Sequence, residues 1–300
     1  MKYDLMIIGG GPAGITASIY AARRKMKFAV ISENIGGQTL WTNNVENYTG
    51  YQFISGADIA KKFEEHIKQF GINLLSEKVI SIEKKSDGIY IKTNKNEYIS
   101  KTVLIASGRV PRLLNVPGEK EYANKGVAYC ATCDGPLYAD QDVAVIGGGN
   151  SALDAALQLL PIANKIYLID TADALRADPV MTEKALSSAK VEVINKAKVE
   201  KISGEKFVTG ITISSDGGAK RDIAVQGIFI EIGSAPAVDF IKEIKKNESG
   251  ELQVNCKCET SVEGIYSAGD ATSVPGKQII VACGEGAKAV IAIFEYLSKN

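Results

Sequence analysis

Residues 128–136 read AYCATCDGP and hold the side chains best suited to chemistry. Cys130 and Cys133 are separated by two residues, and Asp134 follows directly. Two thiols at this spacing can bind a metal ion, pack as small apolar groups, or open and close a disulfide. Disulfide chemistry also needs a proton donor and acceptor, and the carboxyl of Asp134 is placed to serve as one.

Metal binding and inert packing are the less favoured alternatives. A structural zinc site needs about four ligands, usually as two close pairs. The other candidates are Cys256 and Cys258, in a segment NCKCET expected to be a strand, and the single histidine, His66. We therefore predict no metal site. Inert packing suits an apolar run, whereas the stretch ending in Asp134-Gly-Pro is polar and turn-rich, so the sequence favours a redox-active dithiol.

Two glycine-rich turns predict nucleotide binding. Each follows a short apolar run and precedes a helix-forming stretch: Gly9-x-Gly11-x-x-Gly14 and Gly147-x-Gly149-x-x-Ala152. Glycine permits the tight turn, the close approach of a pyrophosphate and close helix–strand packing, and the helix N-terminus favours phosphate.

An acid ends the second strand after each turn. Glu33 lies 19 residues beyond Gly14, and Asp170 lies 18 residues beyond Ala152. An acid at this place accepts hydrogen bonds from ribose hydroxyls. We therefore predict two dinucleotide sites, one for a flavin and one for a nicotinamide, because hydride exchange is the common reason to hold both.

The elements that position these residues form a repeat. Residues 4–33 and 142–170 each read as a strand–helix–strand unit, and each is followed by an antiparallel meander. The tail adds a strand at 264–271 and a helix with Ala287, Val290, Phe294 and Leu297 on one face. We predict an α/β fold of two Rossmann-like three-layer domains, the second inserted in the first. The predicted domains are 1–114 with 241–300 and 115–240, joined by linkers near Pro117 and Pro236.

Composition excludes several classes of protein. Thirty-five Lys and Arg balance thirty-five Asp and Glu, which argues against a nucleic-acid partner. No apolar stretch has membrane-spanning length, and the N-terminus lacks the pattern of a signal peptide, so a cytoplasmic protein is expected. Five cysteines in 300 residues are too few for a disulfide scaffold.

In this order, the flavin-type turn, Cys-x-x-Cys-Asp-Gly, the second turn and SAGD resemble the low-molecular-weight thioredoxin reductases over essentially the whole chain. The likeness is strongest to the reductase portion of the alkyl hydroperoxide reductase flavoprotein, in GVAYCATCDGPLY, VAVIGGGNSALDAA and KQIIVACGEGAKA. That flavoprotein has an extra N-terminal thioredoxin-like region, so we expect a stand-alone reductase here.

The resemblance implies roles for individual residues. Cys133 would lie nearer the flavin, Cys130 would attack the partner's disulfide, and Asp134 would act as acid–base. Rotation of the inserted domain about its two linkers and a homodimer are also implied. The implied FAD residues are Gly9, Gly11, Pro12, Ala13, Gly14, Glu33, Gly37, Gln38, Asn47, Gly108, Gly269, Asp270, Lys277, Gln278 and Ile279. The implied nicotinamide-dinucleotide residues are Gly147, Gly149, Asn150, Ser151, Ala152, Asp170 and Arg176.

One departure from the family concerns the electron donor. NADPH-dependent members have His-Arg-Arg-x-x-x-Arg where this chain has Asp170-Thr171-Ala172 and, of the cations, only Arg176. A carboxylate repels a 2′-phosphate but accepts from a ribose diol, so NADH is predicted over NADPH. Relatives that lack the basic motif also include users of ferredoxin or a deazaflavin, and these donors stay open as alternatives.

The predicted activity is FAD-dependent reduction of the disulfide of thioredoxin or a similar small dithiol protein. A glutaredoxin-like or peroxiredoxin-linked carrier is the second choice of substrate. A non-catalytic redox sensor is the alternative of a different class.

Overall fold

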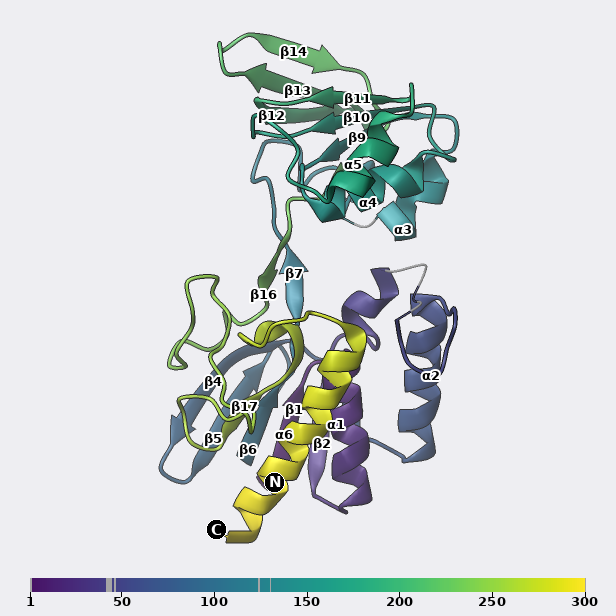
Figure 1. Ribbon diagram of the computed structural model, residues 1–300. Helices are drawn as coiled ribbons and strands as arrows, with labels where there is room; N and C mark the ends of the chain where they lie inside the picture. Colours follow the sequence, from purple (N-terminus) through teal and green to yellow (C-terminus); the bar gives the residue numbers. More distant parts are fainter. Residues whose placement is uncertain (1, 42–44, 46, 124, 130, 300) are drawn as a thin grey trace. The chain divides into compact units, whose positions relative to one another are not determined.

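A computed structural model describes residues 2–41, 45, 47–123, 125–129 and 131–299, with the backbone alone at 41, 132 and 133 (Figure 1). The chain divides into two compact units, residues 1–110 with 235–300 and residues 111–234. The second unit is thus an insertion in the first. Its boundaries lie a few residues before those expected from the proline-bearing stretches.

The first unit is built on a seven-stranded sheet. Its strand order is β3 (Leu74–Leu75), β2 (Phe28–Ile31), β1 (Lys2–Ile8), β6 (Glu97–Ile105), β5 (Gly88–Thr93) and β4 (Val79–Lys85), and β17 (Ile265–Ser267) also pairs with β6. β1 is parallel to β2 and β6, whereas β4, β5 and β6 form an antiparallel meander. Alternate residues of β1 enter two cores: Leu5 and Ile7 lie in one, and Met6 and Ile8 in the other.

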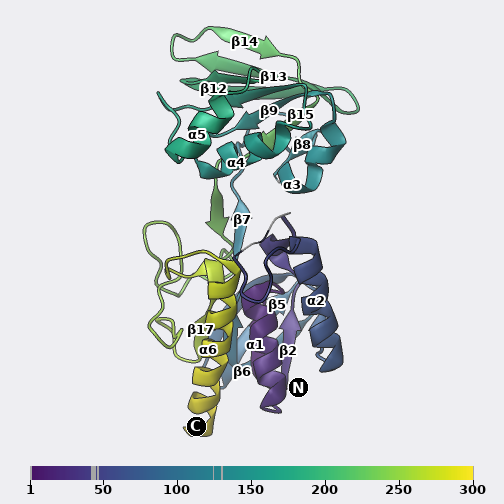
Figure 2. The same ribbon diagram turned by 45° about the vertical axis from the view of Figure 1, so that its right-hand side comes forward.

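Helices α1 (Pro12–Arg23) and α6 (Ile279–Lys299) lie side by side in both views (Figures 1 and 2) and share the core of Leu5 and Ile7. Helix α2 (Gly56–Gln69) and the short turns η1 (Gly37–Trp41) and η3 (Gly269–Ala271) complete the unit.

The expected apolar face of the last helix is buried only in part. Val290 is buried and Leu297 packs against the core, but Phe294 is 40% exposed, and Ala289 and Ile293 also lie in the core. Small residues of α6 allow the close contact with α1, where a Cβ on Gly286 would come 2.1 Å from the carbonyl oxygen of Ala13. Close backbone packing, which an apolar periodicity does not reveal, therefore sets the rotation of this helix.

The inserted unit has a five-stranded parallel sheet. The order is β11 (Val191–Ile194), β10 (Lys165–Ile169), β9 (Asp142–Ile146), β15 (Gly227–Ile230) and β8 (Val127–Ala128). The helical elements are α3 (Ala131–Asp134), η2 (Gly135–Tyr138), α4 (Asn150–Leu159) and α5 (Pro179–Leu186). The meander β12 (Ala197–Gly204), β13 (Val208–Ser215) and β14 (Lys220–Ile223) forms a separate sheet, unlike its counterpart in the first unit.

The two connections between the units pair with each other. β7 (Arg109–Pro111) and β16 (Ser234–Pro236) form a two-stranded sheet. Hydrogen bonds flank it, from Ala237 N–H to the carbonyl oxygen of Gly108 (3.0 Å) and from Arg112 N–H to that of Gly233 (2.9 Å). The chain therefore leaves and re-enters the first unit at neighbouring points.

The segment NCKCET lies outside the sheets. NCKCET is a turn and not the expected strand, because the side chain of Asn255 accepts the N–H groups of Lys257 (2.9 Å) and Glu259 (3.1 Å). Such local side-chain bonds compete with a sheet ladder.

Among the helices of the described ranges, none is long and apolar enough to cross a membrane.

Candidate functional site

A cavity of about 1040 Å³ lies at the first glycine turn. It is lined by all but one of the residues implied for FAD, from β1 and α1, the Gly37 turn, the end of β6 and the start of α6. The exception is Gly14, where a Cβ would come 1.9 Å from the carbonyl oxygen of Gly9. Gly14 therefore serves helix–strand packing, and its neighbours face the cavity.

The first turn is shaped for a closely approaching ligand. Gly9 has φ of +114°, which favours glycine. A Cβ on Gly11 would meet no atom of the described residues within 4 Å, although Gly11 lines the cavity. Helix α1 begins just after Gly11 with no side-chain cap. Its N-terminal end therefore favours an anion in the cavity.

Polar groups in the cavity wall also fit a polar cofactor. The hydroxyls of Thr39 and Ser107 are buried and have no hydrogen-bond partner within the described part of the chain. Buried polar groups ordinarily have partners, so these two point to a ligand that supplies them. Asn47 Nδ2 donates to Gln278 Oε1 (2.9 Å), which joins two residues that the resemblance implied for FAD. These polar side chains and the glycine turn, which leaves room for a closely approaching ligand, thus fit FAD.

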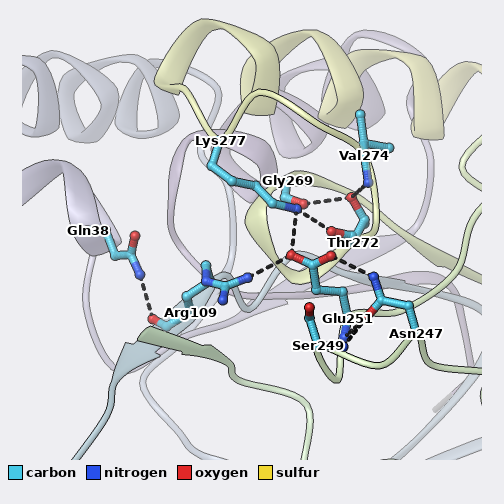
Figure 3. A network of polar contacts seen from close by, with 9 residues as sticks. All are labelled: Gln38, Arg109, Asn247, Ser249, Glu251, Gly269, Thr272, Val274 and Lys277. Carbon is cyan, nitrogen blue, oxygen red and sulfur yellow. Dashed lines mark hydrogen bonds and ion pairs between the residues drawn. The ribbon is translucent and has the colours of Figure 1, made fainter. Parts of the chain in front are cut away.

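A charged network borders this cavity (Figure 3). Oε1 of Glu251 lies 2.9 Å from Arg109 Nη1 and 3.2 Å from Lys277 Nζ, and Oε2 accepts from Asn247 Nδ2 (2.8 Å). Burial works to raise the pKa of Glu251, but the bonds from Asn247 and Lys277 and the charges of Lys277 and Arg109 outweigh it and lower that pKa. Gln38 Nε2 donates to the carbonyl oxygen of Arg109 (2.8 Å). The network therefore includes the first residue of β7.

Sequence reasoning found only part of this network. Gln38 and Lys277 were implied for FAD, whereas Arg109, Asn247 and Glu251 were missed. A charged residue directly after Gly108 was the available signal for Arg109. Asp270 also lines the cavity, and burial raises its pKa while Lys277 and Arg109 partly oppose the change.

A second cavity, of about 700 Å³, lies at the second glycine turn in the inserted unit. Gly147 has φ of +134°, and a Cβ there would come 2.3 Å from the carbonyl oxygen of Glu231. Among the residues that the structure describes, a Cβ on Gly149 would meet nothing within 4 Å, and no side chain caps α4, which begins after it. The predicted residues that line the cavity are Gly147, Gly149, Asn150, Ser151, Asp170 and Arg176. Ala152 is fully buried and only supports the turn.

Asp170 and Arg176 form an ion pair that the sequence did not predict. The Asp170 carboxylate is 5% exposed and lies 3.2 and 3.3 Å from Arg176 Nη2, and the Thr171 N–H donates to it (2.8 Å). A Cβ on Gly148 would come 2.1 Å from Oδ2 of Asp170, so the carboxylate lies directly against the glycine turn. Each carboxylate oxygen has two lone pairs, which leaves acceptor capacity for a ribose.

The dithiol segment is described in part. Cys130 lies outside the described residues, and so does the side chain of Cys133, whose backbone belongs to α3. Asp134 ends this helix half-buried, and burial raises its pKa. A carboxyl with a raised pKa is a better proton donor near neutral pH. No cluster of three or more metal-ligating His, Cys, Asp or Glu side chains occurs in the part of the chain that the structure covers.

Glu231 is an acid that sequence reasoning missed. It follows β15 and lines the second cavity. Burial raises its pKa to about 7, the charge of Asp154 adds to the shift, and a hydrogen bond from the Ala131 backbone N–H opposes it. A single acid within the apolar run GIFIEIG was the signal that could have found it.

Comparison with known proteins identifies the relatives. A model of the pyridine nucleotide-disulphide oxidoreductase family matches residues 3–286. A Bacillus subtilis protein named NADH dehydrogenase is 38% identical over 301 residues, 99% of this chain and 59% of that protein. An alkyl hydroperoxide reductase subunit of Staphylococcus aureus is 38% identical over 302 residues, 99% of this chain and 60% of that protein. The chain thus spans about 60% of the length of these curated relatives.

Among solved structures, thioredoxin reductase of Lactococcus lactis matches with a TM-score of 0.88 and 33% identity. The match covers 99% of this chain and all of that chain. The predicted α/β fold and the resemblance to low-molecular-weight thioredoxin reductases are therefore confirmed.

Proposed function

Because the chain belongs to the pyridine nucleotide-disulphide oxidoreductase family, we propose that it is an FAD-dependent thioredoxin-disulfide reductase. Membership implies a flavin and a nicotinamide nucleotide, and the likeness to the Lactococcus lactis enzyme indicates a flavoprotein reductase of the thioredoxin-reductase type. The observation that carries the proposal is that one unit, residues 111–234, holds both the second glycine-turn cavity and the Cys-x-x-Cys-Asp segment.

The first cavity would hold FAD. Gly9 and Gly11 leave room for its pyrophosphate, and the N-terminus of α1 favours the phosphate charge. Thr39 and Ser107 offer buried hydroxyls that have no partner among the described residues. FAD, when bound, supplies two-electron chemistry between a hydride donor and a dithiol. Glu251 keeps Arg109 and Lys277 in place at the cavity wall.

The dithiol would carry the electrons out. Two electrons and two protons convert the Cys130–Cys133 disulfide to two thiols, and the thiol of Cys133 would lie nearer the flavin. The Cys130 thiolate attacks the partner's disulfide to form a mixed disulfide, which Cys133 resolves, releasing the reduced partner and restoring the disulfide. Asp134 supplies and removes protons, for which its raised pKa suits it.

NADH is the proposed donor. The buried carboxylate of Asp170 lies against the glycine turn, where it would accept from a ribose diol and repel a 2′-phosphate. Arg176, the one retained cation, is paired with that carboxylate. Reduced ferredoxin and a deazaflavin are the competing donors.

A peroxiredoxin-linked carrier is the second candidate partner. The 38% identity to the alkyl hydroperoxide reductase protein of Staphylococcus aureus favours it. Either partner is a small protein with a reducible disulfide, and a homodimer is proposed for the reductase itself.

Anaerobic reduction of the purified flavoprotein tests the donor. NADH, NADPH and reduced ferredoxin are offered in turn, and the flavin absorbance is followed. Bleaching of the flavin by reduced ferredoxin alone would reject NADH as the donor.

Multiple-turnover reduction of thioredoxin disulfide then tests the activity, with Cys130→Ser and Cys133→Ser as inactive controls. A redox sensor would show no sustained flux.

A further inference from the structure

Glu119 is a buried acid that the proposed function does not use. Its side chain is 1% exposed, and it comes directly after the segment of residues 112–118, which follows β7 into the inserted unit. Oε1 accepts hydrogen bonds from the Leu114 N–H (3.0 Å) and the Tyr129 hydroxyl (2.9 Å), and Oε2 accepts from the Asn115 N–H (2.6 Å). Because Tyr129 directly follows β8, the carboxylate joins the 112–118 segment to the parallel sheet.

The backbone that carries Glu119 is itself held in place. The N–H of Glu119 donates to the carbonyl oxygen of Val116 (3.2 Å). On β12, the N–H of Ile202 donates to the carbonyl oxygen of Pro117 (2.9 Å). Gly118 has φ of +89°, and a Cβ there would come 2.2 Å from the carbonyl oxygen of Ile202. The acid therefore projects from a turn that is packed against β12.

The segment that Glu119 holds forms part of the wall of the second cavity. Its residues that line the cavity are Arg112, Leu113, Leu114 and Val116. Asn115 has φ of +58°, a left-handed conformation that is uncommon outside glycine. Leu114 also packs against the core of the unit, whereas Leu113 is 41% exposed. The turn at Asn115 therefore decides where Leu113 lies in the cavity wall.

We propose that Glu119 is a positioning residue for nucleotide binding, which fixes the part of the cavity wall where Leu113 contacts a bound dinucleotide. The proposal rests on the proposed function only in assigning a nicotinamide dinucleotide to the second cavity. A buried carboxylate is costly unless donors satisfy it, and here two successive backbone N–H groups and a hydroxyl do so. Such bonds are roughly twice as strong as those between neutral groups.

Glutamine is the informative replacement because it keeps the size of the side chain. A glutamine has one acceptor oxygen and one NH₂ group in place of the two carboxylate oxygens. Whichever way the amide is turned, its NH₂ group would face the N–H of Leu114 or that of Asn115. Glu119→Gln should therefore release the 112–118 segment without opening a cavity in the core.

The test measures the segment and the ligand separately, in the oxidised holoenzyme. Hydrogen exchange followed by mass spectrometry should be at least about tenfold faster in the 112–118 peptide of Glu119→Gln, because two N–H groups lose a charged acceptor. Isothermal titration with NAD⁺ should give a Kd about five- to twentyfold higher than that of the wild type, at unchanged FAD content. An unchanged Kd would overturn the proposal.

A double-mutant cycle separates positioning from a general loss of stability. Leu113→Ala shortens a partly exposed side chain of the wall, and should raise the Kd by about three- to tenfold without lowering the melting temperature. In the Glu119→Gln background it should have little further effect, because the wall has already lost its position. Additive effects of the two substitutions on the Kd, or no effect of Leu113→Ala alone, would overturn the proposal.

Two further variants complete the design. Tyr129→Phe removes one donor from the carboxylate and carries the test if Glu119→Gln does not fold. It should raise the Kd by about two- to fivefold and again be non-additive with Leu113→Ala, and an additive result would count against the proposal. Glu121→Gln, at an exposed acid two residues from Glu119, is the control and should change neither exchange nor affinity.

Binding of NAD⁺ requires neither the dithiol nor a protein partner. The expected effects on NAD⁺ binding without thioredoxin turnover would therefore reject the proposed function and leave the role of Glu119 standing. A wild-type protein that binds no NAD⁺ would overturn the role of Glu119, whether or not thioredoxin is reduced with another donor.

Discussion

Arg176 Nη2 lies 3.2 Å from Oδ2 of Asp170, and the two side chains differ sharply in exposure, at 67% and 5%. The exposed partner is the cation that could meet a 2′-phosphate, and the buried acid already neutralises it. On the proposed function, we therefore expect Asp170 to set the preference between NADH and NADPH as much as the absence of the family's other cations does.

We predict a preference for NADH over NADPH of at least about tenfold in kcat/KM. Asp170→Ser should narrow that ratio by about tenfold, because it removes the repulsive carboxylate and releases Arg176, and about 1.4 kcal/mol corresponds to a factor of ten. Steady-state kinetics with both donors measure the effect. Asp173→Asn, at an 82% exposed acid paired with Lys196, is the control and should not change the ratio. An unchanged ratio in Asp170→Ser would contradict this account.

Substitution of two glycines of the first turn should affect different properties, FAD affinity for Gly11 and folding stability for Gly14. Gly11→Ala adds a methyl group that meets no atom of the described part of the chain, so the apoprotein should keep its melting temperature while FAD affinity drops at least tenfold. Gly14→Ala forces a Cβ to within 1.9 Å of the Gly9 carbonyl oxygen and should destabilise the apoprotein by more than about 2 kcal/mol. Thermal unfolding and FAD titration by flavin fluorescence separate the two. Equal losses of stability would count against the assigned roles.

Glu251 should stabilise the first unit. Glu251→Ala removes the largely buried carboxylate that Arg109 and Lys277 share, and should cost about 2–3 kcal/mol of unfolding free energy and weaken FAD retention. Because the pKa of Glu251 is lowered from its ordinary 4.5, its contribution is full above pH 4.5 and is lost as pH falls below it. Urea unfolding at pH 7 and at acid pH measures both effects. Glu248→Ala, at an exposed acid three residues away, should change neither.

Asp134 should matter to the dithiol half of the reaction alone. Asp134→Asn should slow thioredoxin reduction by about 10²-fold, the usual size of a general acid–base contribution, and leave flavin reduction by NADH unchanged. Because burial raises the pKa of Asp134, its donor form should persist to higher pH than an ordinary aspartate and be lost as pH rises through the raised value. Stopped-flow measurements of the two half-reactions separate these effects. Asp140→Asn, at an exposed acid with φ of +58° that asparagine tolerates, serves as the control.

Local patterns predicted the fold because each strand–turn–helix unit contains its own apolar run, glycine turn and helix-forming stretch. Gly9, Gly147 and the runs before them predicted where both cavities would form. The rotation of α6 was not predictable in this way, because close contact of Gly286 with Ala13 outweighs the apolar periodicity.

Contacts between distant segments account for most of what was missed. Glu251 meets Arg109 across 142 residues of sequence, and nothing local marks either as a partner. Glu231 differs, since an acid in an apolar run is visible, but its bond to Ala131 depends on β15 and α3 meeting in the fold. The pairing of Asp170 with Arg176 needed the loop after β10 to fold back on Gly148, whose carbonyl oxygen accepts the Arg176 N–H (2.7 Å).

The paired strands β7 and β16 have a consequence for how this chain can be rebuilt. Because the Gly108 carbonyl bonds Ala237 N–H and Arg112 N–H bonds the Gly233 carbonyl, the ends of each unit are already held together at the point of crossing. A short turn between residues 108 and 237 would close the first unit, and residues 111–234 could then be removed as one piece. The inserted unit is therefore a module whose exchange would leave the chain ends of the first unit already joined by hydrogen bonds.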